Sequence, residues 1–249
     1  MNLELLVIVG CILIFSSLVQ GIVGFAFNLF AIPLMIWSGL GLSQAISITA
    51  IPIFIQSLTA TLKLKRYVLW KEVTTASIIR YISIPLGIYL LTLIESFDKN
   101  QIKQIVGLAI LVMVLTQIFL KIEPKEKVGF FWTFSSFFVS GITLGMVSMG
   151  GPTAVLWTMA HKFDVKTSRA FLSALFLLAS PFQIILLYYN FGDTLLNFFL
   201  IGLAFTPIVI FSTLLGIKLG NFLDRIVLQK VAQSLLIITS LVSLFSPYF

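Results

Sequence analysis

Charged side chains are scarce in this sequence. Only 10% of its 249 residues are Asp, Glu, Lys or Arg, whereas soluble domains carry roughly 25%. Hydrophobic residues make up 59% of the chain, and the mean hydropathy is +1.10. This composition excludes an ordinary soluble domain and indicates a polytopic membrane protein.

The sequence also has only one cysteine, Cys11, and one histidine, His161. A single cysteine allows no intrachain disulfide, and in an apolar segment we expect Cys11 to be a small core residue. Metal clusters of the usual spacing, an HExxH motif and a phosphate-binding loop are all missing. We therefore expect no metal, no cofactor and no enzymatic activity. The weakest alternative is an intramembrane serine hydrolase that uses Ser148 with His161.

Acidic residues are missing from the centres of the apolar segments. All nine lie at segment ends or in connections: Glu4, Glu72, Glu95, Asp98, Glu123, Glu126, Asp164, Asp193 and Asp224. A buried carboxylate relay, as used by proton pumps, is therefore not expected. Arg80 is different, because it lies about eight residues into an apolar segment. It either extends to the aqueous surface or serves as the charge partner of an anion.

Long apolar runs fill most of the chain. Segments of about 20 residues, the length that crosses ~30 Å of hydrocarbon as an α-helix, recur at 43–62, 73–94, 101–120, 128–147, 170–189, 195–217 and 227–246. Two interrupted or shorter regions, 3–37 and 150–161, complete the set. Backbone groups in lipid must be hydrogen-bonded within their own segment, so helices are expected throughout. The sequence predicts an all-α fold that forms one integral membrane domain.

The basic residues indicate how often the chain crosses the membrane. If 3–37 and 128–161 each form one crossing, the basic connections divide almost evenly between the two sides. If each region enters, turns at its glycines and returns, thirteen of the sixteen Lys and Arg fall on one side, in 63–71, 121–127, 162–169 and 218–230. The positive-inside rule favours the second arrangement. We therefore expect both termini outside the cytoplasm, in the bacterial inner (plasma) membrane. The net charge of +7 then serves orientation, and no nucleic-acid partner is expected.

This arrangement gives five membrane segments to each half of the chain. An odd number requires that the halves, 1–124 and 125–249, be inverted with respect to the membrane. An offset of 124 residues places Gly21 on Gly145 and Gly24 on Ser148. We therefore expect two inverted repeats of about five segments each.

Both halves contain a glycine-rich interruption, at 21–28 and 148–153, which we interpret as broken or re-entrant helices. Helix N-termini at such breaks carry partial positive charge and bind anions, and secondary transporters build midplane substrate sites from discontinuous helices. The candidate binding residues are Gly21, Gly24, Asn28, Ser148, Gly150, Gly151, Thr153 and Arg80. The alternative for Gly21 and Gly145 is close helix packing. Gln56 and Gln183 are expected to link helices more than to contact substrate.

The two interruptions resemble the sulfite exporter TauE/SafE family of membrane permeases. The resemblance lies in "QGIVGFAFNLFAIPL" (20–34) and "SGITLGMVSMGGPTAVL" (140–156), and the length and two-half arrangement fit the whole chain. The family typically has glycine where this sequence has Ala26 and Ser148. Membership implies transport of small organosulfur compounds or sulfur oxyanions.

We therefore expect a secondary transporter that moves a small anion, such as sulfite or sulfoacetate, by alternating access. Its partners would be the anionic substrate and the lipid bilayer, and a homodimer is a candidate assembly. The alternatives are an anion channel and a membrane assembly protein, and the sequence does not decide between a channel and a carrier.

Overall fold

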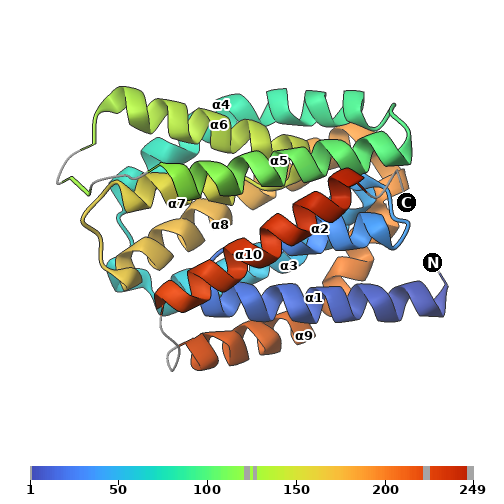
Figure 1. Cartoon of the computed structure of the whole chain (residues 1–249), viewed down its shortest axis with the longest axis horizontal. Helices are drawn as coiled ribbons and strands as arrows, with labels where there is room; N and C mark the ends of the chain where they lie inside the picture. Colours follow the sequence, from blue (N-terminus) through green and yellow to red (C-terminus); the bar gives the residue numbers. More distant parts are fainter. Residues whose placement is uncertain (1, 121–123, 126–127, 221–224, 246–249) are drawn as a thin grey trace.

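The computed structural model describes residues 2–120, 124–125, 128–220 and 225–245. These residues form ten α-helices and two short 3-10 helices (Figure 1). In chain order the elements are α1 (Leu3–Val23), α2 (Phe27–Trp37), α3 (Leu42–Lys63), η1 (Lys65–Tyr67), α4 (Trp70–Ile94), α5 (Lys99–Phe119), α6 (Phe130–Val147), α7 (Gly151–Met159), α8 (Val165–Phe191), η2 (Gly192–Leu195), α9 (Leu196–Gly220) and α10 (Arg225–Phe245). The predicted all-α fold is confirmed.

Six helical stretches are long and apolar enough to cross a membrane. They are Leu3–Val23, Leu42–Lys63, Trp70–Ile94, Lys99–Phe119, Phe130–Val147 and Val165–Leu219, the last of which contains α8, η2 and nearly all of α9. Large hydrophobic side chains cover the outer surface, and Leu3, Phe119, Phe131 and Tyr189 are each more than three-quarters exposed. Such a surface suits contact with lipid and is unusual in a soluble monomer. The chain is an integral membrane protein.

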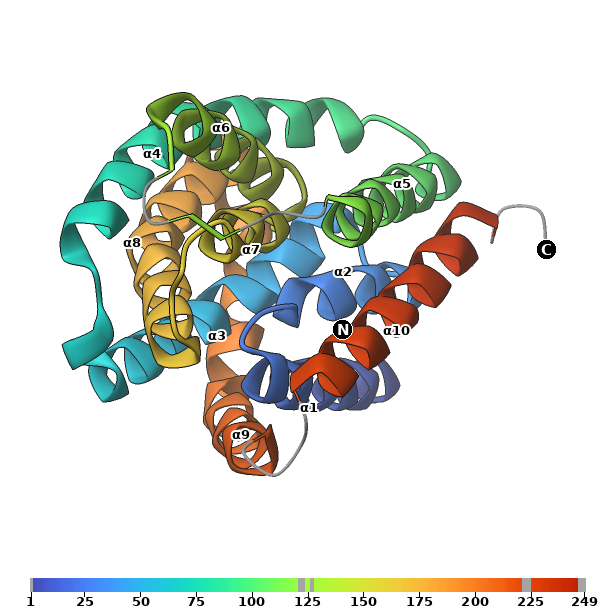
Figure 2. The same cartoon turned by 60° about the vertical axis from the view of Figure 1, so that its left-hand side comes forward.

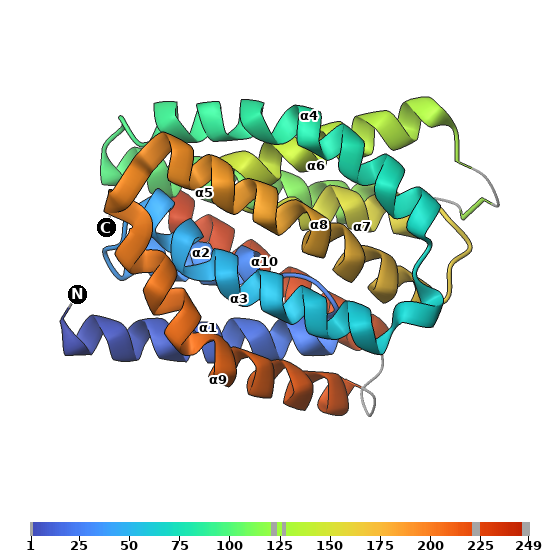
Figure 3. The same cartoon turned by 180° about the vertical axis from the view of Figure 1, so that it is seen from behind.

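The helix ends fall into two groups at opposite ends of the bundle. The start of α1 and the end of α10 lie at the same end as the α4–α5 connection (Figures 1 and 3). The other end holds the α3–α4 and α7–α8 connections, and the α5–α6 connection joins it through Lys125, whose N–H donates to the carbonyl of Ala160 at 2.9 Å. Eleven of the described Lys and Arg lie at or near this second end, against Lys99 and Lys103 at the first. We call the second end the basic end.

Pairs of glycines bring two pairs of helices close together. Helix α1 packs on α9 through Gly21 and Gly216, and a Cβ added to either glycine would lie 3.0 Å from the Cα of the other. Helix α4 packs on α6 in the same way through Gly87 and Gly145, where the corresponding distance is 2.8 Å. Small residues of this kind allow membrane helices to approach closely. The structure therefore supports the packing interpretation of Gly21 and Gly145.

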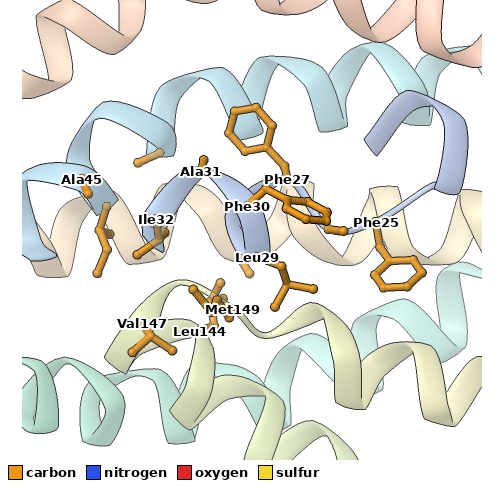
Figure 4. Close-up of a cluster of buried hydrophobic side chains, with 14 of the residues drawn as sticks. Phe25, Phe27, Leu29, Phe30, Ala31, Ile32, Ala45, Leu144, Val147 and Met149 are labelled. Carbon is orange, nitrogen blue, oxygen red and sulfur yellow. The ribbon is translucent and has the colours of Figure 1, made fainter. Parts of the chain in front are cut away.

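The two short helices, α2 and α7, lie inside the bundle. Nine of the eleven residues of α2 and seven of the nine residues of α7 are buried. Figure 4 shows Leu29 and Phe30 of α2 in one apolar cluster with Leu144 and Val147 of α6 and Met149. Helices of both halves surround them, because α3 packs on α8 and α5 packs on α10 (Figure 2). This packing fixes the starts of both short helices in the interior.

The expectation for Cys11 is wrong, because its side chain is exposed. Helix α1 turns one face, which includes Val9 and Leu13, into the bundle. Cys11 lies on the opposite face, and composition alone could not assign it to one side because α1 is apolar all round.

Candidate functional site

The first interruption separates α1 from α2 by three residues. Helix α1 ends at Val23, and Gly24 caps it in the left-handed conformation with φ +94°, donating its N–H to the carbonyl of Gln20 at 2.7 Å. The side chain of Gln20 also reaches the start of α2, where its Oε1 accepts the N–H of Phe27 at 2.9 Å. One glutamine of α1 therefore ties both sides of the interruption together.

The second interruption has the same form. Helix α6 ends at Val147, Ser148 is left-handed with φ +58°, and α7 begins at Gly151. The Ser140 hydroxyl of α6 donates to the carbonyl of Gly150 at 2.5 Å. This bond holds the connection against the helix that precedes it.

Both interruptions contain a residue in a conformation that favours glycine. Ala26 (φ +94°) and Ser148 (φ +58°) are the non-glycine residues with positive φ in the described part of the chain. A left-handed conformation costs a residue with a Cβ about 1 kcal/mol or more. These are also the two positions at which the resembled family typically has glycine, so the structure gives the physical reason for that preference.

A hydrogen-bonded contact joins the two interruptions, although 120 residues separate them in the sequence. The Asn28 side chain donates its Nδ2 to the carbonyl of Ser148 at 2.9 Å and to its hydroxyl at 2.7 Å. The Gln183 amide of α8 donates to the same hydroxyl at 3.1 Å and to the carbonyl of Leu144 at 2.9 Å. Asn28, Ser148 and Gln183 are all buried. The structure thus brings two of the predicted site residues into direct contact.

A narrow space of about 30 Å³ lies beside this contact, and we call it the central crevice. Asn28 and Leu29 line it from α2, Ser148 and Gly151 from the second interruption, and Phe176 from α8. Because a water molecule needs roughly 10–15 Å³ of such space, the crevice has room for one or two waters. It must widen before it can hold a polyatomic anion.

Arg80 lies beside the second interruption and is fully buried. A Cβ added at Gly150 would lie 2.5 Å from Arg80 Nη2, so only glycine leaves room for the guanidinium. Nη1 donates weakly to the carbonyl of Leu175 at 3.5 Å, and the guanidinium carbon lies 5.3 Å from the centroid of the Phe176 ring. The Arg80 side chain therefore does not extend to the surface, which removes that alternative.

Several buried polar atoms at or beside the two interruptions have no hydrogen-bond partner among the described residues. They are Asn28 Oδ1, Thr153 Oγ1, Arg80 Nε and Arg80 Nη2. Unpaired buried polar groups are rare in proteins, and each is unfavourable by about 1–3 kcal/mol. The described acidic residues lie at helix ends or in connections, as predicted, while Glu123, Glu126 and Asp224 fall outside the described residues. The predicted lack of a carboxylate at a helix centre therefore holds for the described part of the chain.

The other predicted site residues lie away from the crevice. Gly21 packs against α9, and both Gly21 and Gly24 line a separate, larger cavity of about 330 Å³ at the basic end, which we call the basic-end cavity. Its lining also includes Lys63 of α3 and Arg169 of α8. Gln20 and Phe176 line both spaces and mark the boundary between them.

Sequence reasoning missed the role of Gln20, whereas the expectation that Gln183 links helices is confirmed by its hydrogen bonds to Leu144 and Ser148. The available signal was a glutamine directly before the first interruption and another within a long apolar segment, since polar side chains in such places need a partner. Gln183 donates to a carbonyl and a hydroxyl group that lie more than thirty residues away in the sequence. No local sequence pattern predicts partners at this distance.

The serine hydrolase hypothesis finds no support in this geometry. The Ser148 hydroxyl is engaged by Asn28 and Gln183. His161 instead places its Nδ1 2.9 Å from the carbonyl of Trp157 and stacks on Phe163. In the described residues, no group of His, Cys, Asp and Glu could hold a metal ion.

The fold and the site define a class: integral membrane proteins in which short buried helices bring polar residues together inside an apolar bundle. The chain belongs to the sulfite exporter TauE/SafE family, since the family model with the description "Sulfite exporter TauE/SafE" matches residues 8–243. Members of this family are transporters and not enzymes. Comparisons with curated proteins and with solved structures gave no match.

Proposed function

We propose that this protein is a secondary transporter of a small anion, a sulfur oxyanion or organosulfonate such as sulfite or sulfoacetate. The observation that carries the proposal is the contact between Asn28 and Ser148, together with the buried guanidinium of Arg80 beside Gly150, whose Nε and Nη2 have no partner among the described residues. A buried cation without a carboxylate is unfavourable unless it gains a partner. An anion that enters the widened crevice would supply that partner.

Hydrogen-bond donors near the crevice favour an oxyanion over a cation. Arg80 has donors at Nε and Nη2 that no described residue accepts, whereas the amide N–H groups of Asn28 and Gln183 already donate to Ser148 and Leu144. The starts of α2 and α7 add the partial positive charge of two helix N-termini. Negative charge is therefore stabilised here by several independent groups.

The packing supports an inverted repeat of residues 1–124 and 125–249. Exchanging the two halves converts the α1–α9 pair into the α6–α4 pair, and each of these pairs is closed by two glycines. Helix α1 runs toward the basic end, whereas α6 starts from it (Figure 1). In this proposal the two interruptions are equivalent broken helices that meet near the membrane centre.

The two spaces differ in size, which supports a carrier that works by alternating access. The basic-end cavity measures about 330 Å³ and the central crevice about 30 Å³. The described residues thus form a wide space at the basic end and a crevice at the centre that is too narrow for a polyatomic anion. Rearrangement of the interruptions would open the crevice and complete the transport cycle.

A ligand screen tests the proposed function. Purified protein is heated with sulfite, sulfate, thiosulfate, sulfoacetate, taurine or simple carboxylates, and the unfolding temperature is measured. A bound anion should raise it, because a ligand at 100 times its Kd stabilises the folded state by about 2.7 kcal/mol. Stabilisation by a cation or a neutral sugar, with no response to any anion, would contradict the proposal.

The orientation gives a second prediction. The basic end should face the cytoplasm, and both termini should lie on the opposite side. Single cysteines placed at Asn2 and Phe249 in a Cys11→Ser background should react with a membrane-impermeant maleimide added outside intact cells. A cysteine at Lys65, in the basic α3–α4 connection, serves as the inside control. Labelling of position 65 but of neither terminus would show that the orientation is reversed.

A further inference from the structure

Three basic side chains line the basic-end cavity, and none of the acidic residues that the structure describes does. Lys63 comes from the end of α3, and Lys166 and Arg169 come from the start of α8. Basic residues at this end of the bundle also orient the chain in the membrane. Orientation, however, requires charges only near the membrane surface and does not require them to surround a cavity.

Two of these cations are held in place by the protein. The Arg169 guanidinium donates through Nη2 to the carbonyl of Ile22 at 2.9 Å and lies against Gly24, where a Cβ would approach its Cγ to 3.2 Å. The ammonium group of Lys166 lies 5.5 Å from the centroid of the Tyr67 ring, within the range of a cation–π interaction. Fixed charges lose little conformational entropy when they bind a ligand.

Gln56 of α3 provides a second, independent observation. Its side chain lines the cavity and is only 3% exposed, yet the amide makes no hydrogen bond to the described residues, and Oε1 is buried without a partner. A buried amide of this kind is unfavourable unless a ligand or water satisfies it. The amide can donate to an oxyanion, or accept from a hydroxyl or amino group of the same ligand.

The rest of the lining defines the kind of anion that fits. Ala60, Leu64 and Ile217 contribute apolar surface, and about 330 Å³ lies at the lower end of the range for small-molecule sites. The carboxylate nearest in sequence, Asp164, does not line the cavity. Asp164 caps α8, and hydrogen bonds from Thr167 lower the pKa of its carboxyl group. Its charge is thus engaged at the helix start.

We propose that the basic-end cavity is a second anion-binding site, separate from the central crevice. It would take a small organic anion that combines a sulfonate or carboxylate group with a short body bearing a hydroxyl or amino group. This inference rests on the proposed anion transport, because the cavity would hold the substrate before or after it occupies the crevice. The Phe176 ring lines both spaces and would separate the two bound positions.

Calorimetric titration of the full chain with 2-hydroxyethanesulfonate tests this second site. The wild-type protein should bind two equivalents. The variant Gly151→Leu, which fills the crevice, should still bind one. Adding Lys63→Gln and Lys166→Gln to that variant should weaken the remaining binding by about tenfold or more, because charge-assisted contacts are lost. Lys71→Gln removes an exposed charge at the same end that does not line the cavity, and it should leave binding unchanged.

The outcomes separate this inference from the proposed function. If Gly151→Leu binds no anion while the wild-type protein binds one, the second site is wrong and the central site stands. If the lysine substitutions leave the binding in Gly151→Leu unaltered, the second site is equally wrong. If the wild-type protein binds no anion at all, both proposals fail.

The titration is repeated in phosphatidylcholine nanodiscs with and without phosphatidylglycerol. Loss of binding only with phosphatidylglycerol would assign the cavity to a lipid phosphate and overturn the soluble-anion assignment.

Discussion

Replacement of Arg80 by methionine is expected to reduce anion transport strongly and to leave the protein folded. Arg80 is fully buried, and two of its nitrogen atoms lack partners in the described chain. Replacing buried charges with apolar side chains of similar volume is often neutral or stabilising by about 1–4 kcal/mol. Without the guanidinium, a bound anion would lose its buried charge partner. Transport should therefore fall by about 30-fold or more. Efflux from proteoliposomes and thermal unfolding of the same sample measure both effects.

Two further variants make the Arg80 experiment specific. Arg80→Lys keeps the positive charge and should retain part of the transport activity. Arg66→Met removes an exposed arginine of η1 and should transport at the wild-type rate. A purely structural Arg80 predicts a lower unfolding temperature in Arg80→Met. Wild-type transport by this variant would show that the anion does not use the guanidinium.

Gly151→Leu is expected to stop transport by filling the central crevice. A Cβ at Gly151 would lie 3.4 Å from the Phe176 ring, which is ordinary van der Waals contact. Alanine should therefore be tolerated, whereas the longer leucine side chain must occupy a space of about 30 Å³. Overpacking of this kind costs about 1–3 kcal/mol of stability, so the protein should remain folded. The measurement is the rate of transport at low and at saturating anion concentration.

The matched control for the crevice is Gly129→Leu. Gly129 precedes α6 at the basic end, and a Cβ there would meet no atom of the described residues within 4 Å. This variant should transport normally. Gly24→Leu is a poorer probe, because Gly24 has φ +94° and any side chain there strains the backbone. Normal transport by Gly151→Leu would contradict a site at the crevice.

The helices could be predicted from the sequence because lipid imposes a simple rule. An apolar segment of about 20 residues must satisfy its own backbone, and such segments are easily recognised. The connections rich in Lys and Arg, 63–71, 121–127, 162–169 and 218–230, could be assigned to one side of the membrane for a similar reason. Those that the structure describes do lie at one end of the bundle. The side of Cys11 could not be predicted, since an almost uniformly apolar helix does not show which face meets lipid.

The site was harder to predict than the helices. Glycine, asparagine and serine mark the two interruptions, so Asn28 and Ser148 could be chosen from local patterns. Gly21 was chosen by the same reasoning, but its packing against Gly216 could not be predicted, because that partner is distant in the sequence. Arg80 could be recognised as unusual, but only the packed structure places its guanidinium beside Gly150.

The pairing of α1 with α9 has a consequence for how the chain is made. Helix α1 finds its main packing partner only after more than 170 further residues have been synthesised. Contacts so distant in sequence form late and slow folding. Until then the glycine face of α1 is open to other helices in the membrane. Assembly of the N-terminal half therefore cannot finish before most of the C-terminal half has been inserted.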